Sequence, residues 1–287
     1  MSPGVSSPVK IHVLVDDYAR RRGFLGQHGF SALVEVCEPT GPLRVLVDTG
    51  QDASVVLSNA ERLGLSLSNL DAILITHGHY DHAGGLLGLL EHIKPRGLLV
   101  VMHPDALKPK LAMRPHLRFI GAPGLSKSAI EERGAIPLLS RAPARISGDV
   151  LATGEIERRT DFEHVEGFST LGPNGLEEDR LMDDQALVVR TERGLIVLTG
   201  CAHSGLINTL RKAVELTGEE RLLAVIGGFH LEGASEERLR RTVEELSALE
   251  PGLVAACHCT GLKAFCYLMR AFGPRFRRLG SGDVLEL

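Results

Sequence analysis

The alternation of apolar and polar positions divides the chain into two blocks of strands and helices, separated by a less regular stretch. In the first block, short apolar runs bounded by turn residues predict strands at 11–15, 30–36, 43–48, 71–76 and 97–102. Helical spacing of apolar residues predicts helices at 52–63 and 85–93. In the second block the same patterns predict a hairpin at 185–190 and 194–199, strands at 222–227 and 253–257, and helices at 206–216 and from Ser235 onward. Two sheets packed face to face with helices outside would bury these strands, so we predict an α/β (α+β type) fold, a four-layer αββα sandwich.

Residues 104–180 lack this regularity. Seven of the 14 prolines fall there, and we expect only short strands, at 117–120 and 150–156. The whole chain, residues 1–287, is expected to form one domain, with 104–180 as an irregular insertion that covers the functional site. Lys127 and the pair Arg158-Arg159 could contact a phosphate there, although basic residues of this kind are more often solvated.

The strand expected at 71–76 ends in a turn rich in metal-ligand side chains, Thr76-His77-Gly78-His79-Tyr80-Asp81-His82. His77 and His79 are two residues apart and can point to one side of the turn, while Asp81 and His82 can reach a second ion. Imidazole and carboxylate ligands favour zinc, with iron and manganese as alternatives, over calcium or magnesium. The alternative interpretation is a histidine-rich surface turn. Four ligand-type residues within six positions, directly after a strand, favour the metal site.

The spacing His77-x-His79-x-Asp81-His82 resembles the metal signature of the metallo-β-lactamase fold superfamily. This resemblance implies one or two divalent ions between the sheets. Members of that superfamily hydrolyse lactams, thioesters and phosphodiesters or reduce oxygen, so the fold does not define the reaction. Asp48, in Asp48-Thr49-Gly50 at the end of a strand, resembles the aspartate that orients a metal-binding imidazole in these proteins. From its spacing alone, Asp48 could equally cap the turn.

Three later strands each end in a histidine, namely His203, His230 and His258. If these strands are parallel, the three imidazoles meet at one edge of a sheet. On the superfamily pattern, the simplest assignment divides the ligands into two groups. One ion would be bound by His77, His79 and His203, and the other by Asp81, His82 and His258. His230 has no counterpart among the usual ligands. We expect it to act on the substrate as a general acid or base, with Asp81 as the second candidate catalytic residue.

The sequence departs from the superfamily pattern at two positions. Thr199-Gly200-Cys201 stands where the pattern usually has Thr-Gly-Asp, whose carboxylate bridges both ions, and Asp183-Asp184 replaces a histidine before the hairpin. His203 could supply a missing ligand from two residues downstream, and Cys201 could be a ligand or a small buried residue. We expect Cys201 and Asp184 to support the ligands or to contact the substrate.

Longer motifs narrow the resemblance. The segments Gly200-Cys-Ala-His-Ser-Gly205, Gly227-Gly-Phe-His-Leu231 and His258-Cys-Thr-Gly261 resemble the subgroup named for 7,8-dihydropterin-6-methyl-4-(β-D-ribofuranosyl)aminobenzene 5′-phosphate synthase. The loop Gln27-His28-Gly29 is similar too, which places His28 near the ligands or the substrate. The subgroup's reaction, in methanopterin synthesis, joins a dihydropterin methyl diphosphate to an aminobenzene ribosyl phosphate and expels pyrophosphate, and metals can neutralise that leaving group. The same ligands suit a phosphodiesterase-like hydrolase.

Composition limits the partners and the compartment. A net charge of −4 argues against a nucleic-acid binder with a broad basic face. Residues 1–10 contain no apolar segment typical of a signal peptide, and no apolar run approaches the roughly 20 residues that cross a bilayer. Five cysteines without framework spacing indicate free thiols. We therefore expect a cytoplasmic location, and the resemblance implies an enzyme with a small phosphorylated substrate. Cys201, Cys257 and Cys259 leave a further alternative, a metal-binding or redox-sensing module without turnover, although Cys257 and Cys259 could be core residues.

Overall fold

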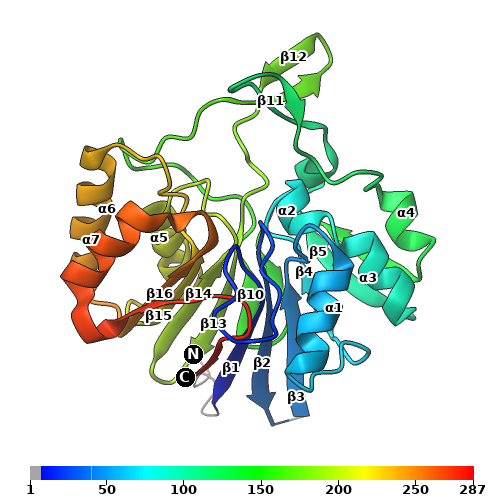
Figure 1. The fold of residues 1–287 in the computed structure, drawn as a ribbon, viewed down its shortest axis with the longest axis horizontal. Coiled ribbons are helices and arrows are strands. Elements are labelled where there is room, and N and C mark those ends of the chain that lie inside the picture. The colour runs from blue at the N-terminus through cyan, green and yellow to red at the C-terminus, as the bar shows by residue number, and fades with distance from the viewer. Residues whose placement is uncertain (1–7, 40) are drawn as a thin grey trace.

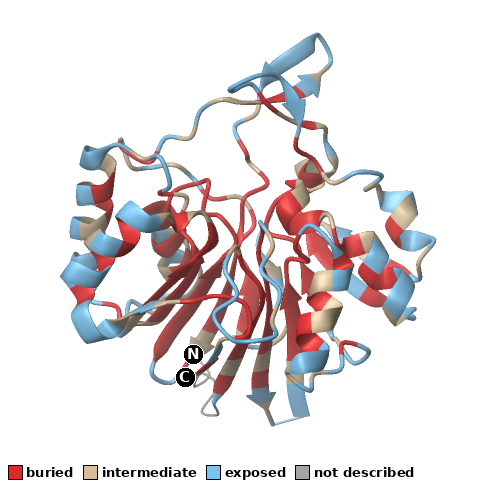
Figure 2. Cartoon of the chain, in the orientation of Figure 1, coloured by how far each residue is buried: buried red, intermediate tan, exposed pale blue. Residues whose placement is uncertain are grey.

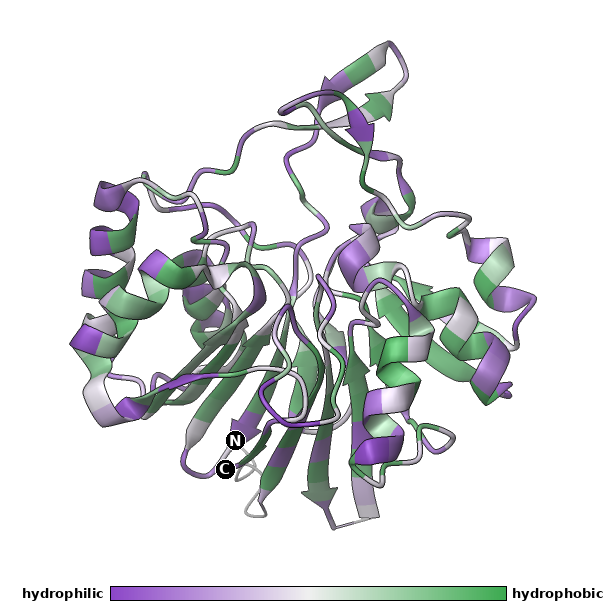
Figure 3. Ribbon diagram, viewed as in Figure 1, coloured by the Kyte–Doolittle hydropathy of each residue, from purple (hydrophilic) through white to green (hydrophobic). Residues whose placement is uncertain are grey.

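Two seven-stranded sheets pack face to face, and helices cover the outer face of each (Figure 1). The computed structural model describes residues 8–39 and 41–287; residues 1–7, part of the stretch in which we found no signal-peptide segment, lie outside it. The strands are buried and apolar, while the helices present exposed polar faces outward (Figures 2 and 3). The predicted four-layer sandwich is thus confirmed. Within the described ranges, no helix combines the length and the apolar character needed to cross a membrane.

The first sheet has the strand order β18-β1-β2-β3-β4-β5-β8. Its strands are β1 (Val9–Val15), β2 (Ser31–Glu38), β3 (Gly41–Val47), β4 (Ala72–Leu74), β5 (Leu98–Met102), β8 (Ala135–Leu139) and β18 (Val284–Glu286). Helices α1 (Ala53–Arg62), α3 (Leu86–Ile93) and α4 (Lys127–Glu131) lie outside it. Val56, Leu86 and Ile130 pack from these helices against the sheet.

The second sheet has the order β17-β16-β15-β14-β13-β10-β9. Its strands are β9 (Ala144–Arg145), β10 (Val150–Ala152), β13 (Ala186–Thr191), β14 (Gly194–Thr199), β15 (Leu222–Gly228), β16 (Leu253–Cys257) and β17 (Phe276–Arg278). The predicted hairpin is present as β13 and β14, and β14, β15 and β16 run parallel. Helices α5 (Leu206–Thr217), α6 (Glu236–Ala248) and α7 (Leu262–Phe272) cover the outer face.

Strand alternation explains why these runs are continuously apolar. Val45 and Val47 of β3 point into the layer between the sheets, and Leu46 between them points to the helices. Both faces of each central strand are therefore buried, and both must be apolar. The layer between the sheets also contains Leu187 and Ile226 from the second sheet, so the two halves of the chain share one core.

The stretch 104–180 is only partly separate from the main sheets. It supplies β8 to the first sheet and β9 and β10 to the second. Its other four strands form a small third sheet, namely β6 (Lys110–Ala112), β7 (Arg118–Phe119), β11 (Phe168–Gly172) and β12 (Gly175–Glu178). We call this four-stranded sheet the flap. Figure 1 shows β11 and β12 projecting beyond the four layers.

Candidate metal centre

The candidate ligands lie at the carboxyl ends of strands from both sheets. His77 and His79 follow β4, and the turn continues into α2 (Tyr80–Ala83). His203 follows β14, His230 follows β15, and His258 begins the short 3-10 helix η2 (His258–Thr260) after β16. Since β14, β15 and β16 are parallel, their carboxyl ends share one edge, and this brings the three later histidines to the turn after β4.

His77, His79 and His203 form the first ligand group. One potential ligand atom from each lies within 4.8 Å of the others, and all three residues are buried. His77 Nε2 is 3.1 Å from His79 Nδ1, and the His203 ring centroid is 4.7 Å from that of His77. Burial lowers the pKa of His77 and His203 well below the usual value, and that of His79 to about 4. The imidazoles are therefore neutral near pH 7, the form that binds metals.

Asp81, His82 and His258 form the second ligand group, again with ligand atoms within 4.8 Å of one another. Asp81 Oδ2 lies 3.5 Å from His82 Nε2 and 3.4 Å from His258 Nε2. Burial raises the pKa of Asp81. The charges of His82 and His258 and a hydrogen bond from His258 outweigh this effect and hold that pKa well below its usual range. This group therefore offers one carboxylate and two imidazoles.

Hydrogen bonds indicate that both ligand groups suit a cation. His82 Nδ1 lies 2.7 Å from Asp48 Oδ2, and His258 Nδ1 lies 2.7 Å from Asp17 Oδ1, so each Nδ1 donates to a carboxylate. The two Nε2 atoms then face each other 3.2 Å apart, each with a lone pair, and a proton or a metal ion must lie between them. Among the described residues, neither ring nitrogen of buried His203 has a hydrogen-bond partner, which is costly without an ion.

Asp48 holds the metal-binding turn together. Besides contacting His82, it accepts hydrogen bonds from the Thr76 backbone N–H and the Thr76 hydroxyl, both at 2.7 Å. A Cβ atom at Gly200 would lie 2.6 Å from Asp48 Oδ2, so only glycine fits opposite this cluster. Asp48 therefore positions His82, and its role extends beyond capping a turn.

Asp48→Asn is expected to lower metal affinity in the second group by about 10- to 100-fold, because an amide accepts the His82 Nδ1 proton less strongly than a carboxylate. Competition with a chromophoric chelator would measure this affinity. Asp52→Asn is the matched control, since Asp52 only caps α1. Equal affinities in wild type and Asp48→Asn would contradict the positioning role.

The loop around His28 reaches the second ligand group, and it contains a partner that the sequence analysis missed. His28 Nε2 lies 3.4 Å from Asp81 Oδ2, although the His28 side chain is 54% exposed. Asp17 contacts both His28 Nδ1, at 3.2 Å, and His258 Nδ1. The pair Asp16-Asp17, two carboxylates directly after β1, is the sequence feature that could have indicated this partner. Asp16 accepts a hydrogen bond from the backbone N–H of His258 at 2.6 Å.

The backbone is strained at four positions around the centre. Asp48, Ala202, His230 and His258 have φ angles of 56°, 57°, 46° and 47°, in the left-handed region that non-glycine residues rarely adopt. Each such residue costs about 1–3 kcal/mol and persists only where the surrounding structure fixes it. The four lie at the ends of β3, β14, β15 and β16. The strained residues thus lie at the strand ends that orient the ligand side chains.

The flap is anchored to the metal-binding turn by a buried ion network that the sequence analysis also missed. Lys110 Nζ lies 2.7 Å from Asp183 and 2.9 Å from Asp179, and Lys110 is 1% exposed. Asp183 Oδ2 accepts the Gly78 backbone N–H at 2.8 Å. Phe168 of β11 lies over the first ligand group, with ring centroids 5.2 Å from His79 and 5.5 Å from His203.

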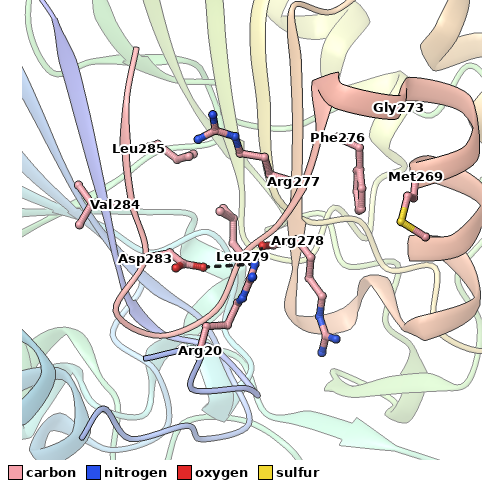
Figure 4. A pocket seen from close by; sticks show the side chains of 10 residues that line it. All are labelled: Arg20, Met269, Gly273, Phe276, Arg277, Arg278, Leu279, Asp283, Val284 and Leu285. Carbon is pink, nitrogen blue, oxygen red and sulfur yellow. Dashed lines mark hydrogen bonds and ion pairs between the residues drawn. The ribbon is translucent and has the colours of Figure 1, made fainter. Parts of the chain in front are cut away.

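A cleft of about 250 Å³ opens onto both ligand groups. Its lining comprises His28, His79, Tyr80, Asp81, Ala112, Arg118, Ile120, Phe168, Cys201, His203, His230, Glu232, His258 and Cys259. A larger groove near the carboxyl terminus is lined by Arg20, Arg277 and Arg278 (Figure 4), but its lining contains no histidine or cysteine. In Figure 4 the side chains of Arg277 and Arg278 point in different directions. The cleft at the ligand groups is therefore the candidate active site.

Comparison with known proteins agrees with this geometry. The family model of the metallo-beta-lactamase superfamily matches residues 29–258. The chain belongs to this superfamily. It is 34% identical to the 7,8-dihydropterin-6-methyl-4-(beta-D-ribofuranosyl)-aminobenzene-5'-phosphate synthase of Methanocaldococcus jannaschii, over 100% of this chain and 99% of that protein. A crystal structure described as a metal-dependent hydrolase of the beta-lactamase superfamily is also 34% identical, with a TM-score of 0.82 over 97% of this chain and 99% of that chain.

Zn(2+)-bound PqqB from Methylobacterium extorquens shares the fold alone, with 11% identity and a TM-score of 0.54 over 97% of this chain and 100% of that chain. Membership of the superfamily and the synthase relative identify this protein as a metal-dependent enzyme. The two full-length relatives are named for different reactions, a synthesis and a hydrolysis.

Cys201 occupies the position at which the superfamily pattern has its bridging aspartate. Cys201 Sγ lies 3.2 Å from His82 Nε2, and Cys201 can share an ion with His77 and His82. It also belongs to a third cluster with His230 and Cys259, and Cys259 was absent from our predicted ligands. A thiol thus lies between the two ligand groups.

Asp184 belongs to none of the possible ligand clusters found among the described residues. Its Oδ2 accepts the Ser204 backbone N–H at 2.8 Å, and burial raises its pKa to about 6. Asp184 therefore supports the turn that carries His203. In place of the usual histidine before the hairpin, this chain has a carboxylate that fixes the backbone of the next ligand.

Proposed function

We propose that this protein condenses a dihydropterin methyl diphosphate with an aminobenzene ribosyl phosphate and releases pyrophosphate. The observation that carries the proposal is the 34% identity to the M. jannaschii synthase along both full chains. We further propose zinc, with iron or manganese as alternatives, in each ligand group, and a cytoplasmic location. The five cysteines are all unpaired, which supports a reducing compartment.

In this reaction the amine nitrogen of the aminobenzene forms a bond to the pterin methylene carbon, and the bond from that carbon to the diphosphate oxygen breaks. Metal ions bound by the two ligand groups would neutralise the charge that develops on the departing diphosphate. The proton released by the amine needs an acceptor. His230 lines the cleft, and its Nδ1 has no hydrogen-bond partner among the described residues, so we assign His230 as that base. Asp81 serves as a metal ligand in this mechanism.

Hydrolysis of a phosphodiester is the second candidate, because the hydrolase structure is as similar to this chain as the synthase is. A redox-sensing module is a third candidate, with divided support. Burial raises the pKa of Cys201 and of Cys257, whereas a sensor thiol needs a lowered pKa. Burial also acts to raise the pKa of Cys259, but a hydrogen bond with Cys201 and the charge of His258 outweigh it and hold that pKa well below its usual value.

The decisive assay supplies both condensation substrates to the metal-loaded protein and detects the joined product by mass spectrometry. Bis-p-nitrophenyl phosphate is tested in parallel, with and without a chelator. The proposal expects product and equimolar pyrophosphate only when both substrates and metal are present. Chelator-sensitive phosphodiester cleavage without any joined product would replace the synthase with the hydrolase.

His230→Ala is expected to keep its metal content and to lose about 10²- to 10⁴-fold in kcat, the usual contribution of a general base. Elemental analysis and single-turnover kinetics would separate the two effects. His164→Ala is the matched control, because His164 is exposed and its side chain hydrogen-bonds only to the Asp161 carbonyl among the described residues. Unchanged turnover in His230→Ala would remove this residue from the mechanism.

A further inference from the structure

Three residues form a row across the flap, one from each of three adjacent strands. Arg118 of β7 pairs with Ala112 of β6, and Ala112 pairs with Phe168 of β11. Side chains at paired positions project from the same face of a sheet, and their sequence neighbours project from the other. Arg118, Ala112 and Phe168 therefore share one face of the flap.

The face that carries this row is the one over the active site. Arg118, Ala112 and Phe168 all line the cleft. Phe119, the next residue after Arg118, does not line it and is 53% exposed, as expected for the opposite face. The flap therefore directs one aromatic ring and one guanidinium into the same cleft.

The two side chains lie at different depths relative to the metal ligands. Phe168 lies directly over the first ligand group and is 6.4 Å from His230 between ring centroids. Arg118 is two strands away in the sheet, which corresponds to about 10 Å between backbones. A ligand lying along the row would have its ring near the histidines and its far end near Arg118.

Arg118 is free to bind such a ligand. Within residues 8–39 and 41–287 it forms no ion pair and no side-chain hydrogen bond, whereas Lys110 of the same flap is paired with two carboxylates. Glu232 also lines the cleft but comes from the segment after β15 and is not paired with Arg118. The backbone next to Arg118 is held in place, because the Tyr80 N–H donates to the Ile120 carbonyl at 2.9 Å and joins the segment just after β7 to the metal-binding turn.

We propose that Arg118 and Phe168 form a substrate-binding subsite on the flap for a planar ring that carries a phosphate. Phe168 packs against the ring beside the ligand groups, and Arg118 binds the phosphate far from the metals. A guanidinium presents a planar pair of donors that matches two phosphate oxygens. The assignment of this subsite to a reaction rests on the proposed function, in which the aminobenzene ribosyl phosphate supplies both the ring and the phosphate. The anion site itself does not depend on the proposed function.

Calorimetric titration with adenosine 5′-monophosphate and with adenosine tests the subsite, since this pair differs only in the phosphate. Titrations on chelator-treated protein exclude phosphate binding to metal. Wild type is expected to bind the monophosphate more tightly than the nucleoside. Arg118→Ala should weaken binding of the monophosphate about tenfold or more and leave adenosine unchanged, as loss of a charged hydrogen bond predicts. Phe168→Ala should weaken both ligands.

Arg180→Ala is the matched control, because it removes one positive charge at the base of the flap from a side chain that is 77% exposed and does not line the cleft. Equal affinity for the monophosphate in wild type and Arg118→Ala would overturn the proposal. So would the lack of any preference for the monophosphate over adenosine in chelated wild type. Failure of the synthase assay alone would leave these titrations unchanged, so the two proposals can fail separately.

Discussion

Protein carrying His79→Ala is expected to fold normally and to lose the ion of the first ligand group. Removal of one of three ligands should lower metal affinity by more than the 10- to 100-fold that is typical for loss of a ligand's hydrogen-bond partner. The fold should persist because the side chain of His79 has one hydrogen-bond contact among the described residues, from Nδ1 to His77 Nε2 within the ligand group itself, and none at Nε2. Elemental analysis after gel filtration gives the number of ions per chain, and circular dichroism checks the fold.

His116→Ala is the matched control for this experiment. His116 is an exposed histidine between β6 and β7 and belongs to none of the possible ligand clusters of the described chain. Its replacement should leave metal content unchanged. Full metal content in His79→Ala would refute the first ligand group as a metal site, whereas loss of metal in both variants would indicate nonspecific binding.

The second large effect is expected at Lys110. Lys110→Met leaves the carboxylates of Asp179 and Asp183 buried without their cation, and breaking a buried ion pair in this way costs about 3–5 kcal/mol. We therefore expect the free energy of unfolding in urea to fall by about that amount. Turnover should fall as well, because Asp183 also holds the Gly78 backbone between the two metal-ligand histidines.

A surface ion pair supplies the comparison. Lys108 lies 3.0 Å from Asp105, but its side chain is 46% exposed, so Lys108→Met should cost no more than about 1 kcal/mol. Adding Asp179→Asn to Lys110→Met should restore part of the lost stability, because one of the two unpaired charges is then removed. Equal stability of Lys108→Met and Lys110→Met would show that the network around Lys110 does not anchor the flap.

Much of the fold follows from the sequence because a parallel strand that is buried on both faces has a continuous run of apolar residues. β14 and β15 are buried on both faces, so each is apolar along nearly its whole length and easy to locate. The histidines that follow β14, β15 and β16 were recognisable for a related reason. Each lies within four residues of the end of its strand, and parallel strands bring their carboxyl ends to one edge.

The extent of the insertion could not be predicted in the same way. β8 contains Pro137, and we took proline-rich sequence there as a sign of irregular structure. β8 is the last strand of its sheet, however, and an edge strand tolerates proline because one side of it has no neighbour to bond. Its alternate residues are also exposed, since only one face is covered, which weakens the apolar signal.

Contacts between distant segments were the other part that local patterns could not reveal. Asp17 and His258 are 241 positions apart, and nothing in either segment encodes the other. The same holds for Lys110 and Asp183, which are read separately as a surface lysine and a turn aspartate. Residue type and spacing thus identify candidate ligands, but the groups that orient those ligands become visible only in the folded chain.

Each ligand group draws on both halves of the chain, and this has a consequence for biosynthesis. His77 and His79 are translated long before His203, and Asp81 and His82 long before His258. In addition, β18, near the end of the described range, pairs with β1, near its start. A nascent chain therefore cannot assemble the first proposed metal site before His203 has been made, or the second before His258. Ions bound afterwards would link the early and late segments to each other. A metal ion would therefore stabilise newly folded molecules as a bound ligand does.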